Sequence, residues 1–257
     1  MNTHTSNSLV LSFTVACLLC LGISAAYAGK PKPASKTDTP QQSRVEKKQL
    51  SEKQSDKNKK VQSLFDGKTL GKWEIVKKYD FQAHGPIKVR DGAIVIDAGS
   101  PASGIRWTGK MPRIDYEITL DAKRTTGSDF FCGMTFPIKK TYCTLIIGGW
   151  GGTIIGLSNI NGSAASENEA CTVGEFESNR WYKIRLRVTS AKIEVWIDKE
   201  KVIDQPTADR KFTIWWEQEP MRPLGIATWL TGSALKNIEL KKLDAAETKK
   251  AGTGNVE

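Results

Sequence analysis

The chain has 257 residues, of which 39% are hydrophobic, and its 38 Lys and Arg residues exceed its 28 Asp and Glu residues, for a formal net charge of +10. Its only histidines are His4 and His84, which excludes a divalent-metal site built from several imidazoles. A histidine general base is therefore available only at His84. His84 lies in an expected loop, where a histidine is more often an incidental surface residue than a catalytic base.

The N-terminal residues predict export. Residues 9–23 form an apolar run of the length of a signal-peptide core, shorter than a membrane-spanning helix. Ala26-Tyr27-Ala28 matches the small-x-small cleavage pattern, so we expect residues 1–28 to be a signal peptide cut after Ala28 and the mature chain to be secreted or periplasmic. No Lys or Arg precedes the run, and a lipid anchor and an uncleaved membrane anchor are the alternatives.

Residues 29–61 predict a disordered, Lys-rich spacer. They carry ten Lys and Arg residues against four Asp and Glu residues, which supplies +6 of the formal charge. With so few large apolar residues, the segment buries too little surface to offset its ordering entropy. It is either a solvated spacer or an electrostatic tether to an anionic envelope surface. No basic patch interleaved with aromatic residues follows, so we expect no nucleic-acid partner.

Residues 62–243 predict one all-β domain. Short β-branched and aromatic runs alternate with Gly, Pro, Asn and Asp, and no window holds a sustained helical period. We expect residues 64–70 and 73–76 to be two strands joined by a turn, and residues 87–97 to be a hairpin with an Asp-Gly turn. Many short strands at close spacing indicate a two-sheet sandwich or jelly roll. Residues 244–257 are expected as a charged tail.

The clearest strand pair lies in residues 181–198, where apolar and polar side chains alternate on both sides of a turn at residues 190–191. Such alternation specifies the register, because a slip by one residue would expose the apolar set. The pairs expected on the outer face are Arg187 with Glu194, Arg185 with Trp196 and Lys183 with Asp198, with Leu186 and Val195 buried. This pairing explains the basic stripe formed by Lys183, Arg185 and Arg187 better than an anion-binding site does.

The stretch 129–171 is expected to present any functional site. Three apolar runs, separated by Gly, Pro and Asn, predict central strands that open into a polar loop. The Gly-Gly-Trp-Gly-Gly run at residues 148–152 is not a phosphate loop, since no Lys-Ser/Thr pair follows and no helix is expected there. It predicts a hairpin turn with close backbone approach.

Carboxylates are the catalytic candidates, because they carry out acid–base chemistry without histidine. These candidates are Glu167, Glu169, Glu175 and Asp129. A solvated acidic loop is the alternative. Indole rings stack on sugars, and side-chain amides and hydroxyls form hydrogen bonds with them. The ligand-binding candidates are Trp107, Trp150, Asn159, Asn161, Asn168 and Trp229, with Ser158 beside them. Most of the eight tryptophans are expected in the core.

Three stretches, which follow one another along the chain in a characteristic order, carry a resemblance to a known family. They are Leu-Phe-Asp-Gly-Lys-Thr-Leu at residues 64–70 with Trp73, Arg-Trp-Tyr-Lys-Ile at 180–184 with 193–204, and Leu-Gly-Ile-Ala-Thr-Trp at 224–229 with 235–240. Together they resemble the bacterial 3-keto-disaccharide hydrolase domain family, also described as 3-keto-glucoside lyase/hydratase domains, over nearly all of residues 62–243. The resemblance implies a concanavalin-like or LamG-like jelly roll and, in active members, chemistry on oxidised sugars.

The chain departs from the catalytic pattern that the resemblance implies. Active members carry an Arg ending the strand at residues 130–136, a Glu early in the strand at 142–145, and a Gln-Asp/Asn-His-Gly run at 227–230; none occurs here. We therefore expect an exported domain that binds a sugar or glycan with the usual catalytic set missing. The alternatives are an active hydrolase or lyase on glycosides that uses the loop carboxylates, and a structural cell-envelope module.

Three cysteines remain after cleavage, Cys132, Cys143 and Cys171. A turn centred on residues 139–140 places Cys132 opposite Ile147, roughly 13 Å along the strand from Cys143, which is beyond the reach of a disulfide. We predict no Cys132–Cys143 bridge, two buried thiols, and Cys171 as the more reactive thiol. With no close set of His, Asp and Glu, we expect no tight transition-metal site and no cofactor.

Overall fold

The structure, a computed structural model, describes residues 61–252. The expected signal peptide (1–28), the spacer up to residue 60 and residues 253–257 lie outside the described residues. Among the helices of residues 61–252, none is long and apolar enough to span a membrane.

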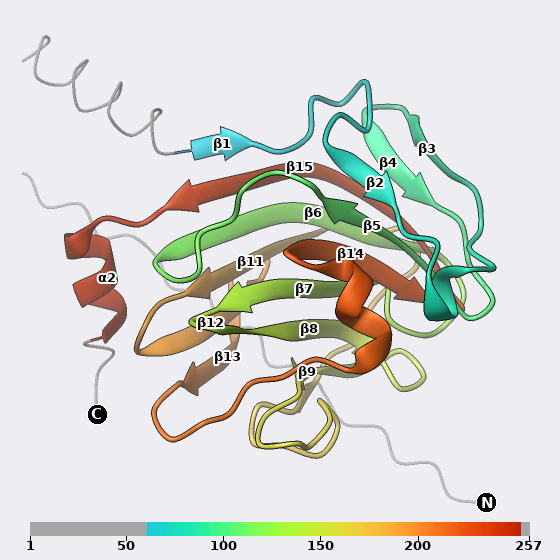
Figure 1. Ribbon diagram of the computed structural model, residues 1–257. Coiled ribbons are helices and arrows are strands. Elements are labelled where there is room, and N and C mark those ends of the chain that lie inside the picture. Colours follow the sequence, from blue (N-terminus) through green and yellow to red (C-terminus); the bar gives the residue numbers. More distant parts are fainter. Residues whose placement is uncertain (1–60, 253–257) are drawn as a thin grey trace, which may run out of the picture. The chain divides into compact units, whose positions relative to one another are not determined.

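Two antiparallel sheets form the domain (Figure 1). Sheet A has eight strands, paired in the order β13-β12-β11-β6-β15-β4-β3, with β1 also on β15. Its strands are β1 (Val61–Ser63), β3 (Ile87–Arg90), β4 (Ala93–Ile96), β6 (Tyr116–Thr126), β11 (Tyr182–Val188), β12 (Lys192–Ile197), β13 (Glu200–Pro206) and β15 (Gly232–Lys242).

Sheet B has seven strands, paired in the order β10-β9-β8-β7-β14-β5-β2. Its strands are β2 (Trp73–Ile75), β5 (Ala102–Trp107), β7 (Cys132–Ile138), β8 (Thr141–Gly149), β9 (Ile154–Ser158), β10 (Thr172–Val173) and β14 (Leu224–Trp229). The expected all-β, two-sheet jelly roll is confirmed. Two short 3₁₀ helices lie in connections between the two sheets: η1 (Tyr79–Phe81) between β2 and β3, and η2 (Trp216–Met221) between β13 and β14.

The core lies between the sheets and takes alternate side chains from each strand. Tyr116 on β6 and Phe136 on β7 are fully buried there, and burying a side chain of this size contributes roughly 1.5–3 kcal/mol. The Tyr116 hydroxyl donates a hydrogen bond to the Pro137 carbonyl at 2.6 Å, which ties sheet A to sheet B. Burial raises the pKa of Tyr116 well above its ordinary value, so the phenol stays protonated as a donor.

The β11–β12 hairpin has the predicted register. Arg187 pairs with Glu194 and Arg185 with Trp196, and the Arg185 guanidinium lies 3.6 Å from the centre of the Trp196 ring. Leu186, like Val195 opposite it, is fully buried. The alternation of apolar and polar residues, together with the turn at residues 190–191, was therefore sufficient to predict the pairing, because a slip by one residue would expose the apolar set.

The β7–β8 hairpin turns at residues 139–140, as predicted. Cys132 pairs with Ile147, and Cys143 pairs with Phe136, so the two cysteines occupy different positions along the ladder. Both thiols are fully buried. The predicted separation and burial of Cys132 and Cys143 are confirmed.

The opening motif forms a turn where we expected a strand. β1 ends at Ser63, and Asp66 Oδ1 then accepts backbone hydrogen bonds from Thr69 and Lys68, each at 2.8 Å. These N–H groups lower the pKa of the Asp66 carboxyl. The Trp73 indole donates to the Leu64 carbonyl at 2.9 Å. Local side-chain hydrogen bonds thus outweigh the strand propensity of the motif.

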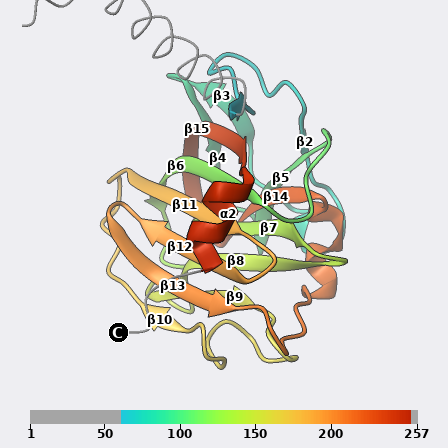
Figure 2. The ribbon, with the colours of Figure 1, turned by 90° about the vertical axis from the view of Figure 1, so that its left-hand side faces the viewer.

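The segment expected as a charged tail contains a helix, α2 (Ala245–Gly252). Asp244 Oδ1 accepts the Glu247 N–H at 2.9 Å, and Glu247 Oε2 accepts the Asp244 N–H at 3.1 Å. This reciprocal pair is a capping box, which satisfies donors that an uncapped helix start leaves unpaired. Figure 2 shows α2 beyond the end of β15.

Candidate functional site

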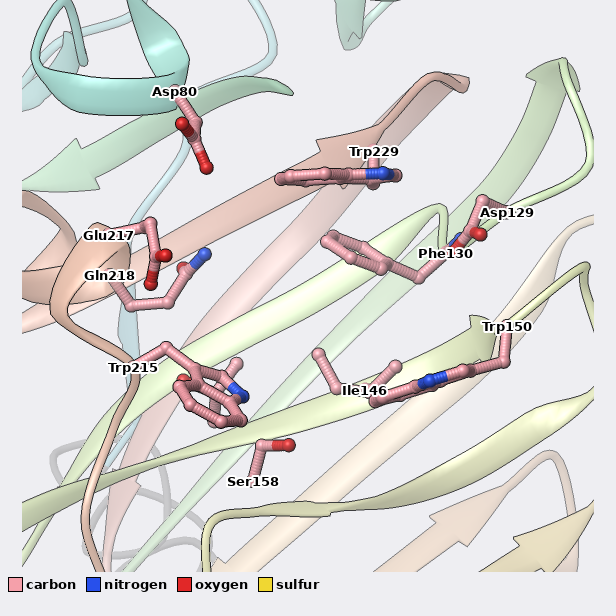
Figure 3. Close-up of a pocket in the computed structure, with 11 residues that line it drawn as sticks. Asp80, Asp129, Phe130, Ile146, Trp150, Ser158, Trp215, Glu217, Gln218 and Trp229 are labelled. Atoms are coloured by element: carbon pink, nitrogen blue, oxygen red, sulfur yellow. The ribbon is translucent and has the colours of Figure 1, made fainter. Parts of the chain in front are cut away.

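A cleft of about 490 Å³ opens on the face of sheet B that points away from sheet A (Figure 3). Its walls combine aromatic rings and carboxylates above a floor of apolar and hydroxyl-bearing side chains. The residues that line it are Asp80, Asp129, Phe130, Thr144, Ile146, Trp150, Ser158, Trp215, Glu217, Gln218 and Trp229.

The floor of the cleft follows from the alternation along the strands of sheet B. On β14, Leu224 and Ile226 belong to the core, whereas Ala227 lies in the small apolar cluster on the opposite face. On β8, Leu145 belongs to the core and its neighbour Thr144 lines the cleft. On β14 small residues alternate with large ones, which keeps the outer face of the sheet low enough for a cleft.

Two glycines allow the 3₁₀ helices to lie directly on this face. A Cβ atom on Gly104 would stand 2.9 Å from the Phe81 ring and 3.0 Å from the terminal methyl of Met221. A Cβ atom on Gly225 would stand 2.7 Å from Met221 Cβ. Phe81 in η1 and Met221 in η2 are fully buried there. Glycine at both positions therefore fixes how closely η1 and η2 approach the sheet.

The solvent side of η1 and η2 is joined by an aromatic pair. The rings of Tyr79 and Trp216 meet edge to face, with centroids 4.9 Å apart, an arrangement that aromatic quadrupoles favour. Between this pair and the buried contact below it, η1 supplies Asp80, and η2 supplies Glu217 and Gln218, to one end of the cleft (Figure 3). Tertiary packing thus brings these three side chains together.

Asp129, Phe130 and Trp150 form the other end of the cleft. Asp129 Oδ1 accepts the Phe130 N–H at 2.7 Å, and Oδ2 accepts the Gly151 N–H at 3.3 Å. Trp150 has φ +49°, uncommon for a residue other than glycine. It sits in the predicted Gly-rich turn, with its side chain 49% exposed. The Phe130 carbonyl accepts the Trp229 N–H at 3.2 Å, which joins this end to β14.

Three of the sequence-predicted site residues, Asp129, Trp150 and Trp229, lie together in the cleft. Trp107 does not, because its position on β5 points the indole into the core. It is 4% exposed, and its ring centroid is 5.4 Å from that of Trp73. The structure therefore removes Trp107 from the ligand-binding candidates.

The three predicted asparagines shape the loop after β9 and do not line the cleft. Asn159 is buried and exchanges backbone hydrogen bonds with Thr213, at 2.7 and 3.2 Å. Asn161 Oδ1 accepts the Lys211 N–H at 2.9 Å. Asn168 Nδ2 donates to three backbone carbonyls at 2.7 to 3.0 Å. Asn161 and Asn168 thus use their side chains to hold the backbone, and Ser158 is the polar residue of this region that reaches the cleft.

The predicted loop carboxylates also lie outside the cleft. Glu167, Glu169 and Glu175 are exposed. Glu169 pairs with Arg210 and accepts a hydrogen bond from Gln205 at 3.3 Å. Its own backbone N–H and the Arg210 guanidinium lower the pKa of the Glu169 carboxyl. The structure therefore does not bring these carboxylates together into a catalytic pair.

Several cleft residues were missed from the sequence: Asp80, Phe130, Thr144, Ile146, Trp215, Glu217 and Gln218. Two features of the sequence indicate some of these residues. Two adjacent tryptophans at residues 215–216 are followed directly by Glu217, outside any strand pattern. Gly, Ala and Thr alternate with large residues on β7 and β14, which marks the open face of sheet B.

The described residues include no cluster of three or more His, Cys, Asp and Glu side chains placed to hold a metal ion. His84 does not line the cleft; its Nδ1 lies 2.8 Å from the Gly85 carbonyl oxygen. The absence of a metal site and of a cofactor stays a prediction.

The sequence matches the model of the 3-keto-alpha-glucoside-1,2-lyase-like domain over residues 60–241. No curated protein matches it. Similar solved structures include a putative glycosyl hydrolase from Parabacteroides distasonis, with 16% identity, a TM-score of 0.45, and coverage of 74% of this chain and 97% of that one.

Two further similar structures are carbohydrate-related modules by their descriptions. Carbohydrate binding module CBM66 from Bacillus subtilis has 11% identity and a TM-score of 0.43, over 66% of this chain and 96% of that one. Domain 4 of AbnA, an extracellular arabinanase from Geobacillus stearothermophilus in complex with arabinotriose, has 15% identity and a TM-score of 0.44, over 70% and 88%.

Proposed function

Because the chain belongs to the 3-keto-alpha-glucoside-1,2-lyase-like domain family, we propose that its cleft binds a carbohydrate and that the domain does not hydrolyse it. The observation that carries the proposal is the composition of the cleft walls. Trp150 and Trp215 are half exposed on either side of an apolar and hydroxyl-bearing floor. Exposed indoles beside a cleft favour stacking on sugar rings, and the carboxylates accept hydrogen bonds from sugar hydroxyls.

The family pattern supports the same cleft. The resemblance implies a Glu in residues 142–145 and a His in residues 227–230 of active members. In this chain these segments supply Thr144 and Trp229, and both line the cleft. The cleft thus includes residues of the two segments in which the resemblance implies a catalytic acid and imidazole, and in this chain those segments supply a hydroxyl and an indole to it. This replacement favours binding over turnover.

Hydrolysis is the second candidate function, since two cleft carboxylates are unpaired. Neither Asp80 nor Glu217 has a hydrogen-bond or ion-pair partner among the described residues. Two carboxyl groups that flank a glycosidic bond are sufficient for acid–base hydrolysis in other enzymes. In this second candidate function, Asp80 and Glu217 take the catalytic role that the sequence analysis gave to the loop carboxylates, which lie outside the cleft.

Calorimetry and product analysis on one purified sample distinguish the two candidates. We expect neutral oligosaccharides or a 3-keto glycoside to bind with a measurable heat, and chromatography to find no product after prolonged incubation. Product that disappears in Asp80→Asn or Glu217→Gln would establish hydrolysis in place of simple binding. Absence of any binding across the sugar panel would contradict the carbohydrate function itself.

We also propose export of the domain, which rests on the sequence of residues 1–28. N-terminal sequencing of the protein from a secreting host is expected to begin at Gly29. A mature chain that retains residues 1–28 would support the uncleaved-anchor alternative. Contact of the basic spacer with an anionic envelope surface is a separate proposal. If the contact is electrostatic, binding to that surface is expected to be lost at high salt.

A further inference from the structure

The cleft has a charge opposite to that of the chain. Its lining includes Asp80, Asp129 and Glu217, and none of its eleven residues is a lysine, arginine or histidine. Asp129 accepts two backbone hydrogen bonds, whereas the carboxylates of Asp80 and Glu217 have no partner within residues 61–252. The acidic end of the cleft therefore carries uncompensated negative charge in a protein with a formal charge of +10.

Gln218 provides a second, independent observation at the same end. The residue is 9% exposed, and its Oε1 atom is buried without a hydrogen-bond partner in the described structure. Figure 3 shows the side chain beside Glu217 and directed into the cleft. A buried carbonyl oxygen without a donor is unfavourable, so a ligand that brings an N–H or O–H group to this point would be stabilised.

The aromatic walls favour the same kind of ligand. Trp215 lies next to Gln218, and Trp229 lies across the cleft from it (Figure 3). The face of an indole attracts a positive charge as well as the apolar face of a sugar ring. Carboxylates set among apolar walls interact more strongly with a cation than carboxylates in bulk water do.

We propose that the cleft selects a carbohydrate with a protonated amine, an amino sugar whose nitrogen is not acylated, over neutral and anionic sugars. This proposal rests on the proposed carbohydrate function and specifies its ligand class. The ammonium lies between Asp80 and Glu217 and donates to Gln218 Oε1, while the sugar ring stacks on the neighbouring indoles. A sugar acid is repelled at the same place. The cleft carboxylates therefore favour amino sugars and disfavour sugar acids.

Calorimetry with the full mature chain at about pH 6 compares three oligosaccharides of equal length. They are a glucosamine oligomer, its N-acetylated form and an oligomer that contains glucuronate. We expect the glucosamine oligomer to bind about tenfold more tightly than the N-acetylated form, the size of one charge-assisted contact, and the glucuronate oligomer to bind weakest. The Asp80→Asn, Glu217→Gln double variant is expected to lose this preference, so that the glucosamine and N-acetylated oligomers bind it with equal affinity.

Glu200→Gln removes a negative charge outside the cleft, at an exposed position of β13 in sheet A, and is expected to keep the preference. Equal affinities for the glucosamine and N-acetylated oligomers would overturn the amine proposal and leave carbohydrate binding intact. A preference that survives the double variant would also overturn it, because the amine would then be recognised elsewhere. Failure of all three sugars to bind would contradict both proposals.

Discussion

At the residue scale, Trp150 depends most on its local backbone. It has φ +49° within a turn in which Gly148, Gly151 and Gly152 also have positive φ. A residue other than glycine in this region costs conformational energy. The turn nevertheless directs a large, half-exposed ring to the edge of the cleft, which is consistent with a functional reason for tryptophan at this position.

We predict that Trp150→Ala weakens carbohydrate binding by about tenfold or more, because a stacking ring at a binding site is typically worth on the order of 2 kcal/mol. Calorimetry measures the loss. Trp181→Ala is the matched control, since Trp181 lies on sheet A between Lys123 and Lys236, with their nitrogens 4.9 and 4.3 Å from its ring centre. Equal affinities for the Trp150 variant and the unmodified chain would exclude Trp150 from the site.

The cysteines give a second prediction at this scale. Burial raises the pKa of the Cys132 thiol to about 12 and raises that of Cys143 as well, so both remain protonated and unreactive at neutral pH. Cys171 is only partly buried. We expect mass spectrometry of native protein, alkylated without reductant, to find the label on Cys171 alone. A peptide that links Cys132 to Cys143 would show that the β7–β8 register differs from the one described.

At the element scale, the site depends on how η1 and η2 lie on sheet B. Their buried contact, Phe81 with Met221, rests on Gly104 and Gly225, and their exposed contact is the pair of Tyr79 with Trp216. The acidic end of the cleft consists of residues between these two contacts. A change under η2 should therefore affect both stability and binding.

We predict that Gly225→Ala destabilises the domain by about 1–3 kcal/mol, the usual cost of overpacking. The added Cβ would stand 2.7 Å from the Met221 carbonyl oxygen, a backbone atom that moves only with η2 itself. Denaturant titration gives the stability and calorimetry the affinity, which should also fall. Unchanged values for both would mean that the position of η2 does not depend on this glycine.

The sequence predicted strands better than it predicted the site, for a physical reason. In β11 and β12 the hydrophobic period and the short turn between them select the register, because a slip by one residue would expose the core residues. Asp80 and Glu217 lie in short 3₁₀ helices without a periodic pattern, and only tertiary packing brings them to one cleft. The loop glutamates looked like a cluster in sequence, yet Glu169 forms its pair with Arg210, far along the chain.

At the scale of the whole molecule, the two sheets provide the stability and the outer face of sheet B provides the site. On the outer face of sheet A, side chains pair with one another through ion pairs and cation–aromatic contacts. One example is the ion pair of Arg187 with Glu117 at 3.0 Å. Sheet B instead presents an unfilled face bounded by two 3₁₀ helices and a glycine-rich turn. Such a division leaves the binding surface free to vary without loss of the core.

A metal requirement is tested at the same scale. We predict that elemental analysis of the purified protein finds no stoichiometric zinc or nickel, since no set of His, Cys, Asp and Glu ligands is close together in the described residues. Dialysis against a chelator should leave carbohydrate affinity unchanged. Stoichiometric transition metal, or a chelator-sensitive affinity, would contradict this prediction.

The most direct test of the central claim is a crystal structure of the mature chain with a bound oligosaccharide. We predict that the sugar lies in the cleft of sheet B, with a ring stacked on Trp150, Trp215 or Trp229 and polar groups on the carboxylates of Asp80 and Glu217. An intact glycosidic bond is expected. A sugar bound on sheet A, or on the asparagine-rich loop after β9 with the cleft empty, would contradict the account.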